Sequence, residues 1–347
     1  MKTSTPSLNW LVCGLLLGTT AYSCKTKDVS SITPITYTFA GFDNVKLPEV
    51  TPTAPAAVSV TAGGVTSSTL AAAVSAGLSN IASSGQVPAS VQQAGAAVGQ
   101  AVSASRASQL ASSLNPDMIS SGTLSADMKK ELSALANNAA LKAYMPSYTL
   151  PTVNGKAVGA RVGAGGITLV PVANATQQDG SSDACRQAAS AAYTTVVQSL
   201  DATRTSQNTA INNNYTQLET AANSEVTSCQ ASSPTRYTDL RTTLRTQLNS
   251  SLATLNSVRA TTGDALYNQL ALMMYVGYVQ ALTNVDTIQA ADLNTCTATR
   301  DAKIAAAKTA RDSDLNRVTT NYNTVLSTAA TVRDRAVASC HNQGNGG

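Results

Sequence analysis

The chain has 347 residues with 23 basic and 19 acidic side chains, a net charge of +4, and only 12% of its residues are charged. An ordinary globular chain is about 25% charged. The chain has a single histidine, His341, so catalytic dyads and metal sites built on histidine are not expected. The balance of charges predicts no nucleic-acid partner, and the composition points to no enzyme and no cofactor.

Residues 1–23 have the features of a secretory signal peptide. A polar start with one lysine precedes an apolar run over 10–17, and small residues follow before Cys24. The run is too short for a membrane-spanning helix. Two cleavage patterns remain open at this point. Ala21-Tyr22-Ser23 suits an ordinary signal peptidase, and the stretch that ends at Cys24 resembles the loose lipobox of Bacteroidota lipoproteins.

The number of cysteines favours the lipobox. Cleavage after Ser23 removes Cys13 and leaves five cysteines, an odd number for a secreted chain. If Cys24 carries a lipid, four remain that can pair outside the cytoplasm, where disulfides persist. We therefore expect membrane anchoring through Cys24 in the cell envelope. The resemblance implies the outer membrane, on either face, because Lys25 replaces the Asp that retains similar lipoproteins at the inner membrane.

Residues 24–180 are expected to form a tether, short helices and a linker. Residues 24–68 form a lipid-anchored tether interrupted by prolines. Residues 69–145 form an Ala/Ser/Gly-rich helical region, with helical periodicity over 69–84, 89–114 and 126–144. The first two windows have small-residue faces, typical of loosely docked helices or of a segment for self-association or lipid contact. Residues 146–180 predict a linker of loops and short strands.

The four remaining cysteines predict the architecture of residues 181–341. Cys185 and Cys229 are 44 residues apart, as are Cys296 and Cys340, and the two halves centre on Thr261-Thr262-Gly263, a turn signal. An antiparallel helical hairpin would pair Cys185 with Cys340 and Cys229 with Cys296. Pairing within each arm is excluded for continuous helices about 66 Å long. A parallel pairing, Cys185 with Cys296, would require the chain to travel back along the whole arm. A metal site is not expected without a C-x-x-C pair.

Two shorter helices are expected in the middle, one starting at Ser233-Pro234 and the other near Asp264. The sequence leaves open whether they extend the hairpin or fold back into a four-helix bundle. The second contains an apolar run over 270–279 that a two-helix ribbon cannot cover. The run is the core of a bundle or a tip that binds a partner. Its candidate interaction residues are Leu270, Met273, Met274, Tyr275 and Tyr278.

The sequence thus predicts a mainly α protein, a disulfide-stapled hairpin or bundle preceded by short helices, loops and a few short strands, and followed by a disordered tail at 342–347. The first functional hypothesis is a non-enzymatic lipoprotein that acts as a spacer or protein-interaction module, with a protein partner or self-association. The alternative is a surface adhesin or membrane-active protein that uses 270–279. Mixed charges along the last helix predict a solvated face, with the acids Asp301, Asp312, Asp314 and Asp334.

Overall fold

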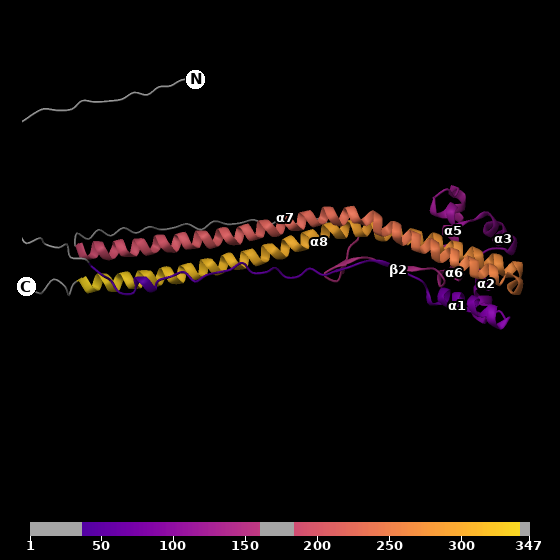
Figure 1. The fold of residues 1–347 in the computed structure, drawn as a ribbon, viewed down its shortest axis with the longest axis horizontal. Helices are drawn as coiled ribbons and strands as arrows, with labels where there is room; N and C mark the ends of the chain where they lie inside the picture. Colours follow the sequence, from indigo (N-terminus) through magenta and orange to yellow (C-terminus); the bar gives the residue numbers. More distant parts are fainter. Residues whose placement is uncertain (1–36, 160–183, 341–347) are drawn as a thin grey trace, which may run out of the picture.

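The computed structural model describes residues 37–159 and 184–340. Two long helices, α7 (Ala184–Ser257) and α8 (Arg259–Ser339), pack antiparallel along their whole length. Figure 1 shows them as a rod, with the short N-terminal helices gathered at its closed end. At 1.5 Å per residue, the 74 residues of α7 span roughly 110 Å. The predicted hairpin is confirmed.

The reversal between the arms lies where the turn signal predicts it. Val258 leaves the helical conformation after α7, and Gly263 has φ 76° and ψ 159°. This positive φ suits glycine because it has no Cβ. The first residues assigned to α8 therefore belong to the turn, and the straight helix begins after Gly263.

Both disulfides have the antiparallel connectivity. Cys185 bonds to Cys340 at the open end, and Cys229 bonds to Cys296 midway along the rod, each with a Cα–Cα distance of 5.8 Å. Three arginines also lie over tyrosine rings of the opposite arm, at 4.1–5.1 Å from the ring centroid, namely Arg204 over Tyr322, Arg311 over Tyr215 and Arg333 over Tyr193. The two residue numbers of each arginine–tyrosine pair average to 263, the position of the turn glycine. The register between the two arms is therefore constant along the rod.

The predicted helix start at Ser233-Pro234 is wrong, because α7 continues through Pro234. Proline has no amide hydrogen to donate to the carbonyl of Gln230, so a bend is expected, and Figure 1 shows the rod bent about midway. Ser233 caps nothing and instead donates a hydrogen bond to Asp292 of α8 at 2.8 Å. The nearby disulfide and this contact hold α7 on α8 through the bend. The middle helices therefore extend the hairpin and do not fold back.

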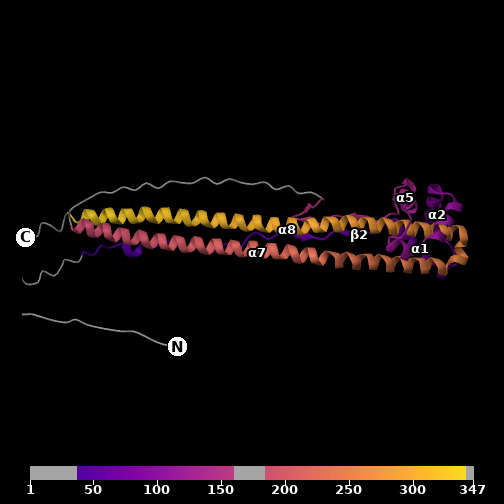
Figure 2. The same cartoon turned by 90° about the horizontal axis from the view of Figure 1, so that it is seen from above.

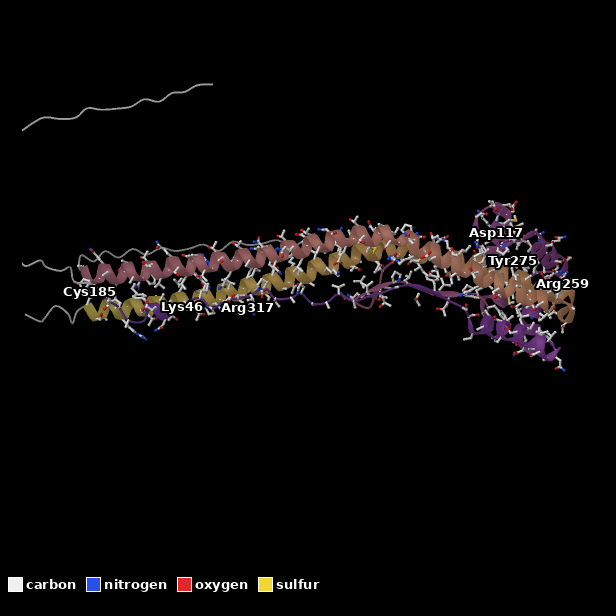
Figure 3. All side chains as sticks on the ribbon, viewed as in Figure 1. Lys46, Asp117, Cys185, Arg259, Tyr275 and Arg317 are labelled. Atoms are coloured by element: carbon white, nitrogen blue, oxygen red, sulfur yellow. A yellow bond between two sulfur atoms is a disulfide. The ribbon has the colours of Figure 1, made fainter. Side chains whose placement is uncertain are left out.

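The segment expected to be a tether is docked on the hairpin from residue 42 to residue 58, which we call the strap. It begins with the short helix η1 (Phe42–Asn44) near the open end, where Phe42, Val45 and Leu47 are buried against both arms. Further along, Val50 packs on Ile211 and Val318. Contacts of these apolar side chains with successive parts of the arms explain why the strap follows the rod (Figure 3).

Short strands connect the strap to the closed end. Strand β1 (Val60–Thr61) pairs antiparallel with β4 (Thr152–Val153), which pairs with β5 (Lys156–Ala157). Strand β2 (Gly64–Thr66) pairs with β3 (Ser147–Thr149). Strands β2, β3 and β4 lie on α8. The described part of the predicted linker thus contains strands, and residues 160–180 lie outside the described residues.

The small-residue region forms a head around the closed end of the hairpin (Figure 2). Its helices are α1 (Thr69–Ser84), α2 (Ala89–Ala101), α3 (Ala104–Ser113), α4 (Pro116–Ser120), α5 (Ala126–Ala136) and α6 (Ala139–Lys142). Ser125 caps α5 by accepting a hydrogen bond from the amide of Met128. The two longer windows are each interrupted, at Val102 and at Asn138, where the backbone is extended.

The head covers the apolar run of α8. Leu270, Leu272 and Val276 are fully buried in one cluster with side chains from the head, including Leu110 and Leu132. A two-helix ribbon leaves one side of such a helix in water, and the head removes that side from solvent. The core interpretation of 270–279 is therefore the one that the structure supports.

Candidate functional site

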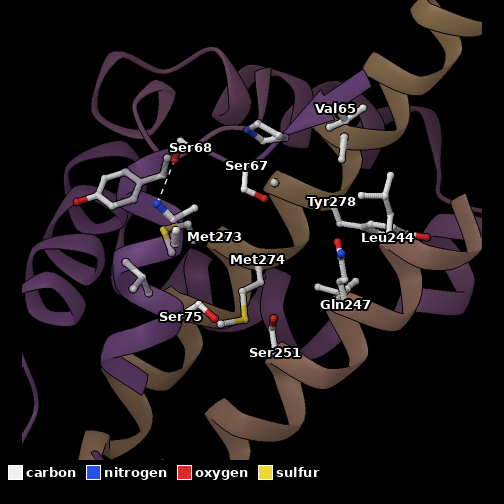
Figure 4. Close-up of a pocket in the computed structure, with 18 of the residues that line it drawn as sticks. Val65, Ser67, Ser68, Ser75, Leu244, Gln247, Ser251, Met273, Met274 and Tyr278 are labelled. Carbon is white, nitrogen blue, oxygen red and sulfur yellow. Dashed lines mark hydrogen bonds between the residues drawn. The ribbon is translucent and has the colours of Figure 1, made fainter. Parts of the chain in front are cut away.

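The head contains an open groove. It lies between α1 on one side and α7 on the other, with α8 as its floor, and encloses about 710 Å³ (Figure 4). Ligand sites typically enclose 300–1,000 Å³ and often lie between helices. The groove is open to solvent, so it is suited to part of a larger molecule.

The groove is lined without a single charged side chain. Its apolar surface comes mainly from Leu244 and Leu248 of α7 and from Met273 and Met274 of α8. Figure 4 shows Met274 between Ser75 of α1 and Ser251 of α7. The polar groups are hydroxyls and the Gln247 amide, which can donate and accept hydrogen bonds but do not attract an ion.

Four of the five candidate interaction residues are buried inside the fold. Leu270, Met273, Tyr275 and Tyr278 are at most 7% exposed, and burial raises the pKa of both tyrosine hydroxyls. Met274 is half-buried and lines the groove. The head covers these four side chains, so they do not form an exposed apolar tip. Met274 is the most accessible of the five, and the small exposed parts of Met273 and Tyr278 line the same groove.

A second, smaller cavity of about 400 Å³ lies beside the inner disulfide. Here Asp292 accepts hydrogen bonds from Ser233 and from Arg236, the latter at 2.6 Å. Burial, and then the charge of Asp292, raises the pKa of the neighbouring Tyr237 to about 12. These groups satisfy one another across α7 and α8, so the cluster is a structural contact between the arms.

An acidic side chain that the sequence assigns to a solvated face holds the strap. Asp301, Asp312 and Asp334 are indeed exposed and each contacts the preceding arginine. Asp314 is instead 1% exposed. It contacts Arg317 and accepts two hydrogen bonds from Thr53. The prediction is wrong for Asp314 because the strap covers it, and no signal in the charge pattern separates it from its neighbours.

The remaining predictions concern metals, membranes and Cys24. In residues 37–159 and 184–340, no three Asp, Glu, His or Cys side chains come together as metal ligands. None of the helices in these same ranges is both long and apolar enough to span a membrane. Cys24, the signal peptide and the tail at 342–347 lie outside the described residues.

Comparisons with known proteins identify no relative: no family model, curated protein or solved structure matches the chain. The proposed function therefore rests on the fold and the groove.

Proposed function

We propose that the protein is a non-enzymatic cell-envelope lipoprotein, anchored through a lipid on Cys24 at the outer membrane, in which the hairpin is a spacer and the head is an interaction module. The observation that carries this proposal is the placement of the two ends. The described chain begins beside the open end of the hairpin, and the head surrounds the closed end (Figure 1).

The docked strap supports the spacer role because it determines where the chain leaves the rod. With the strap bound, the chain leaves at the open end, roughly 110 Å from the closed end. Without it, the last fixed point would be β1, whose Val60 lines the cavity beside Cys229 and Cys296. The part of α8 between Gly263 and Cys296 is only about 50 Å long. Docking of the strap therefore roughly doubles the distance between the closed end and the point where the chain leaves the rod.

Anchoring is tested by metabolic labelling with a fatty-acid analogue. The Cys24→Ala variant should lose the label and move to the soluble fraction, since acyl chains supply the membrane affinity. Cys13→Ala is the matched control, because this cysteine lies within the signal peptide, and it should keep the label. Equal labelling of Cys24→Ala and the wild type would contradict the proposal.

The spacer role is tested by energy transfer from a protein fluorophore to dye-labelled lipids. A probe at Lys46→Cys, which is exposed near the open end, should transfer energy to the membrane. A probe at Thr261→Cys, exposed in the turn at the closed end, should not, because roughly 110 Å separates it from the anchored end. Equal transfer from both probes would mean that the rod lies along the membrane.

The alternative, an adhesin or membrane-active protein that uses 270–279, has little support from the geometry because those side chains are mostly buried. Sedimentation of the unlipidated protein with liposomes tests it, and the proposed function expects the protein to stay in the supernatant.

A further inference from the structure

Gly277 lies inside α8, on the floor of the groove, and its side-chain position faces empty space. A methyl group placed there would meet no atom within 4 Å. Glycine in a helix interior costs about 1 kcal/mol relative to alanine. The fold of one copy therefore provides no reason for glycine at this position.

The other glycines inside helices of the head do have such a reason. A Cβ at Gly77 would lie 2.8 Å from Val91, and one at Gly99 would lie 3.3 Å from Gln269. At Gly95 it would overlap Leu266 of α8. A Cβ would therefore clash with another helix at Gly77 and Gly95, and at Gly99 it would be in tight contact with the end of the Gln269 side chain. Gly277 is also a glycine inside a helix, but no neighbouring helix lies close to it.

The missing neighbour has to match the chemistry and shape of the groove. An ion is unsuitable because no charged side chain lines the site. The wall formed by α1 presents Ala72, Ser75, Ala76 and Ser79, which are short and exposed. Such side chains, together with Gly277, allow a helix backbone to come close. A groove between helices with these walls fits an uncharged helix better than a bulky side chain or a charged peptide.

We propose that α1 of a second copy of this chain occupies the groove, so that the heads of two molecules form a symmetric dimer. All 16 residues of α1 are uncharged, and its exposed residues include Leu70 at 42%. Because α1 is itself a wall of the groove, a twofold axis beside α1 places each copy's α1 against the other's groove. A twofold interface is self-complementary in this way. No charge is desolvated when the two faces meet.

This inference deepens the proposed interaction module, and its test needs no membrane. Sedimentation velocity is measured over a range of concentrations on the exported chain carrying Cys24→Ala, so that no lipid drives association. The background chain should show a monomer–dimer equilibrium. Gly277→Leu should weaken the dimer at least about tenfold, while the monomer stays at least as stable, since the new side chain enters empty space in the monomer and leucine favours the helix more than glycine does. Thr283→Leu, which adds the same side chain at an exposed position of α8 outside the groove, should dimerise normally.

A second pair of variants locates the contact. Under mild oxidation, Ser75→Cys on the groove side of α1 should give a covalent dimer, whereas Asn80→Cys, exposed on α1 but outside the groove, should not. A background chain that stays monomeric at all concentrations would overturn the proposal, as would a Gly277→Leu variant that dimerises normally. Fatty-acid labelling at Cys24 is measured separately, so failure of the dimer is distinguishable from failure of the anchor.

Discussion

Asp314 of α8 accepts two hydrogen bonds from Thr53 in the strap, one from the backbone amide at 2.6 Å and one from the hydroxyl at 2.7 Å. The two residues are 261 positions apart in the sequence. A second polar contact, from the Gln207 side chain to the Pro48 carbonyl at 3.0 Å, ties the strap to the other arm. The strap has few backbone partners elsewhere, so these polar contacts and its buried apolar side chains together hold it on the rod.

Removal of the Asp314 carboxylate should release the strap and leave the rest of the protein folded. Two hydrogen bonds to a buried charge are lost in Asp314→Ala, a cost of about 3 kcal/mol. Hydrogen exchange should therefore rise at the Val45 and Thr53 amides, which are hydrogen-bonded in the docked strap, and stay unchanged in the head. Asp312→Ala is the matched control, since this exposed residue on the same helix contacts only Arg311 and Lys308. Equal exchange in both variants would show that Asp314 does not hold the strap.

The strap should also respond to acid through Asp314. Burial acts to raise the pKa of this carboxyl, but hydrogen bonds from Thr53 and the Arg317 guanidinium outweigh it and hold the pKa below the usual 3.8. A lowered folded-state pKa means that the stabilisation is present above the usual value and is lost as the pH falls through the folded value. The NMR shift of the Thr53 amide proton should therefore titrate below pH 3.8. In Asp314→Asn this titration should disappear, and its persistence would assign it to another group.

The disulfides should be recovered by proteolysis without reduction as peptides joining Cys185 to Cys340 and Cys229 to Cys296. Chain entropy gives each about 4–5 kcal/mol of stabilisation. Replacing Cys185 and Cys340 together by serine should raise hydrogen exchange at the open end while the circular dichroism stays helical. Replacing the inner pair should act midway along the rod instead. A linked peptide containing Cys185 and Cys229 would be incompatible with a continuous first arm.

A charge in the apolar run of α8 should unfold the head. Val276 is 0% exposed, so Val276→Asp buries an unpaired carboxylate and should cost about 4 kcal/mol or more. Thermal unfolding by circular dichroism measures the loss. The exposed Thr283→Asp on the same helix should have little effect. An unchanged melting temperature for Val276→Asp would mean that this side chain is not in the core.

Two glycine-to-alanine substitutions should change the free energy of unfolding in opposite directions. A Cβ at Gly63 would lie 2.7 Å from both the Thr149 carbonyl oxygen and Ile288, so Gly63→Ala should destabilise the protein by about 1–3 kcal/mol. Gly277→Ala meets open space and should stabilise α8 by up to about 1 kcal/mol in the monomer. Chemical denaturation at low protein concentration measures both. Destabilisation by Gly277→Ala under these conditions would indicate an unnoticed contact at the groove floor.

The sequence predicts the hairpin because its determinants are local and periodic. The equal spacing of Cys185 to Cys229 and of Cys296 to Cys340, together with the turn at Gly263, specifies antiparallel arms in one register. The same reasoning fails at Ser233-Pro234, which is a helix start by local preference. Packing of α7 on α8, held by the Cys229–Cys296 disulfide and Asp292, outweighs the lost hydrogen bond of one proline.

The positions of the strap and the head are decided by tertiary structure alone. Three prolines within residues 48–55 make residues 42–58 look like a tether, yet Val45, Leu47 and Val50 find apolar surface on a rod formed more than a hundred residues later. Likewise, the sequence shows that 270–279 needs cover but not what provides it. Periodicity within a segment reveals which face is apolar, whereas the partner of that face depends on contacts between distant segments, for which local sequence carries no signal.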